Sequence, residues 1–202
     1  PLLIIARKSM PAQNLRELIA YLKANPDKAT QGTAGSGGAS HVAGVFFQKA
    51  TETQFQFIPY RGAGPAMTDL LSGQIDMMVD LAASAAPRAR AGSVKAYAVT
   101  SKKRLEAAPD VPTVDEAGLP GFYVESWHGI WVPKDTPKEV IGKINAAAVQ
   151  ALADPVVRQR LLNIGQVVFA PEQQTSEAMY AFQKAENEKW WPIIRAANIK
   201  AN

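Results

Sequence analysis

The stretch Gly32–His41 contains the residues whose types and spacing are best suited to chemistry. It holds four glycines and three hydroxyl side chains between a short predicted strand and an amphipathic helix that begins near His41. Glycine leaves the backbone uncovered, so N–H groups in such a stretch can approach a ligand closely. We predict that Ser40 caps the helix, whose first N–H groups and positive dipole end favour an anion. The spacing fits a site for a small carboxylate and fits a flexible turn capped by Ser40 equally well.

Nucleotide-binding motifs do not match this stretch. A P-loop requires Lys and then Ser or Thr after its last glycine, whereas Gly38 and Ala39 follow Gly37 here. A dinucleotide fingerprint requires a third glycine at the position of Ser40, and Glu52 is too close to serve as its ribose partner. Binding of a nucleotide is therefore not predicted.

A serine hydrolase is the alternative function. Residues 34–38, Ala-Gly-Ser-Gly-Gly, approximate the nucleophile elbow of hydrolases, with Ser36 as the nucleophile. A triad would also need His128, the histidine downstream, and Asp80 or Asp110 as the acid. The strand predicted before Ser36 is weak, and four glycines followed by a capping serine suit an anion site better.

Two further groups follow predicted strands. The strand 54–58 leads into Arg61 and Gly62, and the buried strand 75–81 ends near Asp80. The guanidinium group of Arg61 either pairs with a ligand carboxylate or is simply solvated. The carboxylate of Asp80 either caps the next helix or orients a hydroxyl group, an amine or a water molecule at the ligand site.

Apolar periodicity predicts an α/β fold. Short apolar or alternating runs are separated by amphipathic helices through the first half of the chain, which is typical of βαβ units and a parallel sheet. Ligands of such sheets bind beyond the carboxyl ends of the strands, so the glycine-rich stretch, Arg61-Gly62 and Asp80 should meet at one edge. The predicted strands are 2–6, 29–31, 54–58, 75–81 and 94–100, and the predicted helices begin at Asn14, near His41, at Pro65 and after Asp80, the last bent or split by Pro87.

The pattern changes in the second half of the chain. Residues 107–121 are rich in proline and glycine and are predicted to form a long connection with one short helix, followed by an extended segment, 122–132. The remaining predicted elements are a helix 137–153, a helix capped by Asp154, a short strand 167–169, and a final helix that begins at Thr175 and is anchored by Trp190 and Trp191. We therefore place a domain boundary near Glu125.

Composition excludes several classes of function. The 22 basic and 18 acidic residues are interspersed, which argues against nucleic acid as a partner. A chain with no cysteine has no disulfides, no thiolate catalysis and no cysteine metal site. His41 and His128 lie far apart and lack the spacing of metal ligands, so neither a metal nor another cofactor is predicted. No apolar run approaches the roughly 20 residues that a membrane-spanning helix needs.

Several motifs in a fixed order resemble one family. They are residues 33–41 (Thr-Ala-Gly-Ser-Gly-Gly-Ala-Ser-His), 58–62 (Ile-Pro-Tyr-Arg-Gly), 69–76 (Asp-Leu-Leu-Ser-Gly-Gln-Ile-Asp), 98–101 (Ala-Val-Thr-Ser), 110–113 (Asp-Val-Pro-Thr), 116–118 (Glu-Ala-Gly) and Trp127-x-Gly129. Over essentially the whole chain, they resemble the solute-binding receptors of tripartite tricarboxylate transporters, often called the Bug family.

This resemblance implies a periplasmic, two-domain receptor without enzymatic activity that closes about a hinge. It implies that the ligand is a small carboxylate, often a dicarboxylate, and that the receptor delivers it to integral membrane transporter subunits. The ligand-binding loop of the second domain corresponds to residues 36–40. Together with the groups above, the candidate ligand-binding residues are Ser36, Gly37, Gly38, Ala39, Ser40, His41, Gly62 and Asp80.

The resemblance also implies a division into domains. Chains of the family begin well before Pro1, and their N-terminal segment supplies half of the first domain together with the opposing ligand loop. Residues 1–125 are then the ligand-binding second domain, and residues 126–202 are the C-terminal part of an incomplete first domain. The expected fold is α/β, a periplasmic binding protein-like two-domain architecture with a parallel-rich sheet flanked by helices. An exposed apolar remnant of the first domain would favour self-association of the chain.

Overall fold

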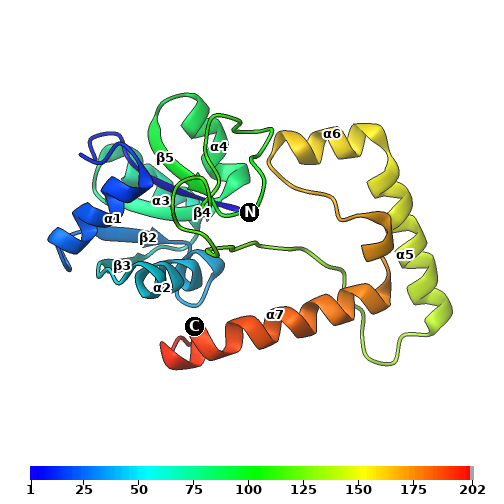
Figure 1. Ribbon diagram of the computed structural model, residues 1–202. Coiled ribbons are helices and arrows are strands. Elements are labelled where there is room, and N and C mark those ends of the chain that lie inside the picture. Colours follow the sequence, from blue (N-terminus) through cyan, green and yellow to red (C-terminus); the bar gives the residue numbers. More distant parts are fainter. Residues whose placement is uncertain (201–202) are drawn as a thin grey trace.

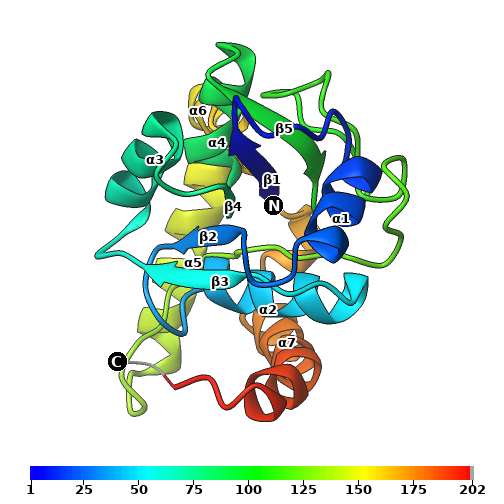
Figure 2. The same cartoon turned by 90° about the vertical axis from the view of Figure 1, so that its left-hand side faces the viewer.

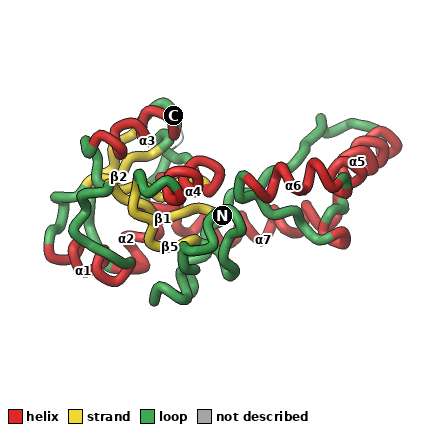
Figure 3. Tube along the Cα trace, turned by 90° about the horizontal axis from the view of Figure 1, so that it is seen from above, coloured by secondary structure: helices red, strands yellow, loops and turns green. Residues whose placement is uncertain are grey.

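The computed structural model describes residues 1–200. Figure 1 shows a β-sheet covered by helices and an arm of helices that is joined to it by an extended segment. Viewed from above in Figure 3, the arm projects away from the sheet, so the molecule is elongated. Among the described residues, Gly165 is the single buried residue that follows Val124. The core therefore belongs to the sheet part of the molecule.

Five strands form one sheet. They are β1 (Leu2–Arg7), β2 (Thr30–Thr33), β3 (Gln56–Pro59), β4 (Met77–Leu81) and β5 (Val94–Val99). Their order across the sheet is β3-β2-β4-β1-β5. Strand β2 pairs in parallel with both β3 and β4, whereas β1 pairs antiparallel with both β4 and β5.

The antiparallel β1 corrects the expectation of a parallel sheet that the βαβ pattern gave. A continuous apolar run indicates that both faces of a strand are buried, but it does not report the direction of the strand. β1 is inserted between β4 and β5 instead of lying beside β2, which follows it in the sequence. The other four strands run in one direction, so the sheet is parallel-rich, as predicted.

Seven α-helices lie within residues 1–200. They are α1 (Leu15–Ala24), α2 (Ala39–Thr51), α3 (Ala63–Ser72), α4 (Ala82–Arg90), α5 (Lys138–Ala153), α6 (Pro155–Asn163) and α7 (Ser176–Ala196), and a 3₁₀ turn, η1, spans Pro171–Gln173. Three predicted helix starts are confirmed, because the side chains of Asn14, Asp154 and Thr175 each accept a hydrogen bond from a backbone N–H in the first turn.

Helices cover both faces of the sheet. As Figure 2 shows, α1 and α2 lie on one face, and α3 and α4 lie on the other. The alternation of side chains along β1 serves both faces: Leu2 and Ile4 contribute to the core beneath α1 and α2, and Leu3 and Ile5 contribute to the core beneath α3 and α4. This packing fixes the ends of the strands from which the candidate ligand loops emerge.

Two local predictions are wrong, and one of the two alternatives given for a third, at Pro87, is excluded. Residues 107–121 form turns without a helix, because Thr113 and Glu116 bond to each other's backbone N–H groups and close a single turn. Residues 167–169 form no strand, since no neighbouring strand is available to pair with them. Pro87 does not split α4, which continues from Ala82 to Arg90 around it.

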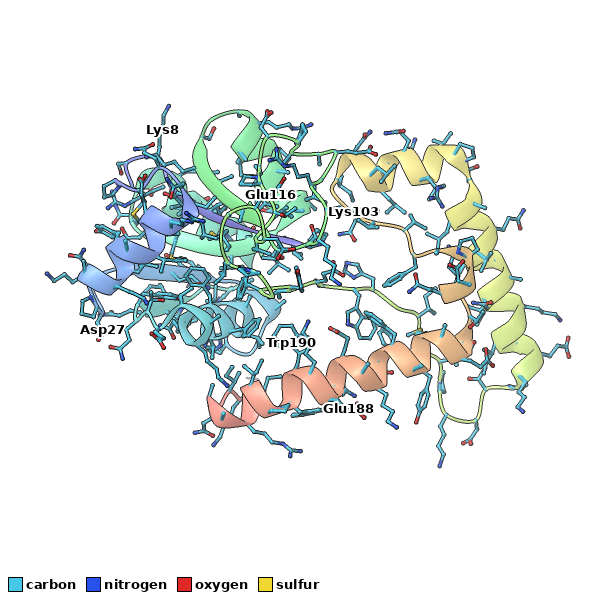
Figure 4. The ribbon with its side chains drawn as sticks, in the orientation of Figure 1. Lys8, Asp27, Lys103, Glu116, Glu188 and Trp190 are labelled. Atoms are coloured by element: carbon cyan, nitrogen blue, oxygen red, sulfur yellow. The ribbon has the colours of Figure 1, made fainter. Side chains whose placement is uncertain are left out.

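The arm consists of α5, α6 and α7, and α7 returns to the sheet part beside α2 (Figure 1). Trp190 packs edge-on against Phe46 of α2, with ring centroids 5.7 Å apart, and the ammonium group of Lys189 donates a hydrogen bond to the carbonyl oxygen of Tyr123. Figure 4 shows Trp190 on the side of α7 that faces α2. The predicted anchoring role is thus confirmed for Trp190, whereas Trp191 is 49% exposed and contributes little to the contact.

Among residues 1–200, no one helix has both the length and the apolar composition of a membrane-spanning segment. Helices α5 and α6 reach that length and composition only together, with a bend of 73° between them. The buried members of one core cluster extend to Val124 and those of the other to Val111, so the core ends close to the boundary expected near Glu125. The assignment of residues 126–202 to an incomplete first domain stays a prediction.

The two neighbouring tryptophans of α7 provide a test of how the arm is held. We predict that Trp190→Ala lowers the free energy of unfolding by about 2 kcal/mol, because it removes apolar burial and an aromatic contact with Phe46. Trp191→Ala is the matched control and should change it by less than about 0.5 kcal/mol. Urea unfolding monitored by circular dichroism measures both values. Equal losses for the two variants would contradict the anchoring role of Trp190.

Candidate functional site

The candidate site lies at the carboxyl edge of the three parallel strands β2, β3 and β4. The register places Gly32 opposite both Ile58 and Met78, so the chain leaves the three strands at nearly the same level. The backbone N–H of Tyr60 also donates a hydrogen bond, 3.0 Å long, to the carbonyl oxygen of Thr33. The loops after β2 and β3 therefore start side by side, as ligand loops of open α/β sheets do.

The glycine loop, residues 34–38, is closed by side chains from the first turn of α2. The backbone N–H of Ala34 donates to Oγ of Ser40 at 2.9 Å, and the N–H of Gly37 donates to Nδ1 of His41 at 3.0 Å. A third bond runs from the N–H of Gly38 to the carbonyl oxygen of Gly35. The loop is therefore held in one shape before any ligand arrives.

The prediction that Ser40 caps α2 is wrong. The helix begins at Ala39, and the residue at the cap position is Gly38, with φ −71° and ψ 167°. Ser40 is buried inside the first turn, where its hydroxyl group faces back toward Ala34 and cannot accept from the N–H groups ahead of it. The serine closes the loop instead of capping the helix.

Two glycines of the loop occupy backbone conformations that other residues adopt only with strain. Gly35 has φ +129° and Gly37 has φ +76°. Positive φ values are readily available to glycine alone among the common residues. The glycines of this loop are therefore required by its backbone conformation. A flexible turn, the alternative interpretation, does not account for the three hydrogen bonds that close the loop.

Within the glycine loop and the first turn of α2, four backbone N–H groups have no acceptor among residues 1–200. Among the described residues, the N–H groups of Gly35, Ser36, Ala39 and Ser40 donate no hydrogen bond. Those of Ala39 and Ser40 belong to the first turn of α2, which is the positive end of the helix dipole. Unpaired N–H groups at a helix N-terminus favour a bound anion such as a carboxylate.

The loop after β3 lies beside the glycine loop. A Cβ atom at Gly35 would lie 3.7 Å from the carbonyl oxygen of Tyr60. Gly62 occupies the cap position of α3 with φ +135°, and the exposed Arg61 precedes it without an ion pair among residues 1–200. The Tyr60 hydroxyl donates to Oδ2 of Asp69 at 2.7 Å. Burial and this carboxylate raise the pKa of Tyr60 to about 12, so the hydroxyl stays protonated.

Asp80 lies beneath the edge and not on it. The cap position of α4 is Leu81, so the predicted capping role of Asp80 is wrong. The carboxylate is buried, and its Oδ2 atom has no hydrogen-bond partner in the described part of the chain. Burial raises the pKa of Asp80, while the Ser84 hydroxyl, the Leu81 N–H and the charge of Arg88 act in the opposite direction. A ligand does not reach this oxygen in the present conformation.

His41 is directed at the loop itself. Its half-buried ring packs edge-on against Phe57, with centroids 4.8 Å apart. Because Nδ1 accepts a hydrogen bond from Gly37, the ring is neutral and carries its proton on Nε2. Burial lowers the pKa of His41, which favours the same neutral form. His41 shapes the loop and leaves its Nε2–H group as a donor.

The geometry does not assemble the hydrolase triad. Ser36 lies in the middle of the glycine loop, and no hydrogen bond joins it to a histidine within residues 1–200. His128 lies on the extended segment that leads to the arm, and Asp80 is enclosed beneath α4. No group of three or more histidine or carboxylate side chains suited to a metal ion occurs among the described residues.

A separate cavity of about 510 Å³ lies in the arm, away from the glycine loop. Aromatic and aliphatic side chains from α5, α7, the extended segment and the connection between α6 and η1 line it, including Trp127, Phe169 and Phe182. Nearby Ile130 and Trp131 are 63% and 57% exposed. Whether this apolar surface mediates self-association of the chain stays a prediction.

Sequence reasoning missed Gln31. This side chain is fully buried beneath the glycine loop, and its Nε2 atom donates a hydrogen bond to the carbonyl oxygen of Ser40 at 3.0 Å. The one available signal was a glutamine inside a short strand that leads directly into the loop.

The neutral form of His41 provides a test of the loop structure. The pKa of His41 is lowered in the folded chain, so the unfolded chain binds a proton more readily as the pH falls through about 6.5. Folding stability is therefore lost on acidification, and protonation of Nδ1 also removes the acceptor for Gly37. We predict that His41→Asn, which keeps an acceptor but does not titrate, loses less stability than the unmodified chain between pH 7.5 and about pH 5.

Urea unfolding at several pH values measures this difference. His128→Asn is the control for loss of a histidine elsewhere and should retain the pH dependence of the unmodified chain. The role given to His41 is contradicted when His41→Asn and the unmodified chain lose stability in parallel.

Comparisons with known proteins agree with this architecture. A family model described as a tripartite tricarboxylate transporter family receptor matches residues 1–199. A protein from the TAR-I ttuE-ttuC' intergenic region of Agrobacterium vitis is 41% identical over 197 residues, which cover 98% of this chain and 57% of that protein. The chain thus spans little more than half the length of this curated relative.

Solved structures show the same fold. The periplasmic binding protein BugD is 40% identical, with a TM-score of 0.87 and coverage of 100% of this chain and 67% of that one. MatC from Rhodopseudomonas palustris, solved with bound malate, is 36% identical, with a TM-score of 0.88 and coverage of 96% and 66%. A second R. palustris protein, solved with adipate, is 27% identical, with a TM-score of 0.86 and coverage of 98% and 66%. This chain therefore belongs to the tripartite tricarboxylate transporter receptor family, a family of solute-binding receptors and not of enzymes.

Proposed function

We propose that the protein containing this chain is an extracytoplasmic receptor that captures a small carboxylate, most readily a dicarboxylate. The observation that carries the proposal is the group of four unpaired backbone N–H groups, those of Gly35, Ser36, Ala39 and Ser40, at the carboxyl edge of the parallel strands. Neutral N–H donors bind a carboxylate without an opposing charge and release it without breaking an ion pair.

The proposed roles of the predicted residues follow from their positions. Ser36, Ala39 and Ser40 supply, together with Gly35, the N–H groups that bind one carboxylate of the ligand. Gly37 and Gly38 shape the loop, because their own N–H groups are bonded within it. Gly62 admits the ligand beside them at the start of α3. His41 holds the loop and offers its Nε2–H group. The carboxylate of Asp80 is enclosed, so Asp80 acts indirectly: it supports the end of β4 beneath α4, or it bonds to a water molecule that in turn bonds to the ligand.

The relatives support the class of ligand and the setting. MatC was solved with malate and a second R. palustris protein with adipate, and both molecules are dicarboxylates. BugD is described as a periplasmic binding protein. We extend these properties to the present protein: a periplasmic receptor that delivers its carboxylate to integral membrane subunits of a tripartite tricarboxylate transporter.

Ala39 offers a direct test of carboxylate binding by backbone N–H groups. Ala39 is the first residue of α2, a position that tolerates proline, and Gly38 before it has the extended backbone that precedes proline readily. Ala39→Pro therefore deletes one N–H group and leaves the helix intact. We predict that malate, succinate or adipate raises the melting temperature of the protein that contains this chain, and that Ala39→Pro in that protein weakens affinity for the active ligand by about tenfold.

Ser176→Pro is the matched control, because Ser176 is the first residue of α7 and Thr175 before it is also extended. It should leave carboxylate affinity unchanged. Titration calorimetry with the same dicarboxylate measures all three proteins. The proposal is contradicted if none of the dicarboxylates binds, or if Ala39→Pro binds as tightly as the control.

A further inference from the structure

Gln31 is an unusual residue for an interior strand of a sheet. It lies in β2 between the neighbouring strands β3 and β4, and its side chain is fully buried against α2. Nε2 donates to the carbonyl oxygen of Ser40, but Oε1 has no hydrogen-bond partner among the described residues. A buried amide oxygen without a partner destabilises the fold, because it has lost its hydrogen bonds to water.

The opposite helix is shaped to accommodate this amide. A Cβ atom at Gly44 of α2 would lie 2.5 Å from Nε2 and 2.6 Å from Oε1 of Gln31, and equally close to the ring of Phe57. Glycine inside a helix also destabilises the helix relative to alanine. Two residues that are each unfavourable for stability, a glycine in the middle of a helix and a polar side chain in the core, are therefore in contact with each other.

The contact between Gly44 and Gln31 leaves room for one hydrogen bond, from Nε2 of Gln31 to the carbonyl oxygen of Ser40. The carbonyl oxygen of Ser40 lies in the first turn of α2, next to the unpaired N–H groups of Ala39 and Ser40. The Ser40 hydroxyl closes the glycine loop from the other side by accepting from Ala34. Ser40 is thus held at its carbonyl oxygen by Gln31 and at its hydroxyl group by the loop.

We infer that Gln31 is a positioning residue that orients the first turn of α2 for carboxylate binding, at a cost to the stability of the empty protein. This inference rests on the proposed function. An apolar side chain of similar size would fill the same space without leaving Oε1 unpaired, and the Ser40 carbonyl would keep the hydrogen bond that it accepts within the helix. Gln31 is therefore needed for the direction of the N–H groups and not for folding.

The test is the opposite effect of Gln31→Met on stability and on affinity. The unfolding midpoint of the empty variant in urea should stay unchanged or rise, while its affinity for malate, succinate or adipate falls by about three- to tenfold. A residue with a purely structural role would lose stability when replaced. Gln48→Met is the matched control, because Nε2 of Gln48 also donates to a backbone carbonyl, that of Phe55, at the far end of α2. Gln48→Met should leave affinity unchanged.

Gly44→Ala tests the same contact from the helix side, and it too should weaken affinity, because its methyl group displaces the Gln31 amide. Unchanged affinity in Gln31→Met, with binding by the unmodified chain, overturns this inference and leaves the proposed function standing. Loss of folding in both variants assigns Gln31 a structural role and also overturns it. An unmodified chain that binds none of the three dicarboxylates overturns the proposed function and, with it, this inference.

Discussion

The hydrogen bond from the backbone N–H of Ala34 to the hydroxyl group of Ser40 is the contact on which the candidate site depends. It joins the end of β2 to the first turn of α2 and so turns residues 34–38 into a closed loop. With the chain tied at this point, Gly35 and Gly37 adopt positive φ values and their neighbours present N–H groups that nothing in residues 1–200 accepts. The remaining structure holds the two ends of this loop in place.

The parallel register of β2 with β3 and β4 supplies one of these ends. Gly32, Ile58 and Met78 are level across the sheet, so the loops after the strands begin at a common edge. The other end is the first turn of α2, where Gln31 bonds to Ser40 from within the core and His41 bonds to Gly37. Neutral donors arranged in this way suit a carboxylate, and their rigidity reduces the entropy that is lost on binding.

The features of the fold that depend on residues close together in the sequence could be predicted from it. Asn14, Asp154 and Thr175 cap helices because each side chain bonds to an N–H two or three residues ahead, so spacing alone identifies them. The convergence of the glycine loop and Gly62 was likewise predictable, because parallel strands end at one edge. The family resemblance added the class of ligand.

The failures occur where a contact partner is distant or where backbone angles decide the outcome. The helix after the loop begins at Gly38 and Ala39 because Gly38 is extended, and this frees Ser40 to bond backward to Ala34. The direction of β1 depends on its insertion between β4 and β5, which an apolar run does not encode. The position of Asp80 at the end of a strand predicts a carboxylate at the edge of the sheet, yet the packing of α4 encloses the side chain.

The central claim is that a carboxylate binds to the unpaired N–H groups of this loop. It is tested most directly by ¹H–¹⁵N correlation spectra of the protein recorded with and without a saturating dicarboxylate such as malate. The account predicts that the largest shifts fall on the backbone N–H groups of Gly35, Ser36, Ala39 and Ser40. Binding that leaves these four signals unmoved, or that shifts mainly residues lining the cavity of the arm, would contradict it.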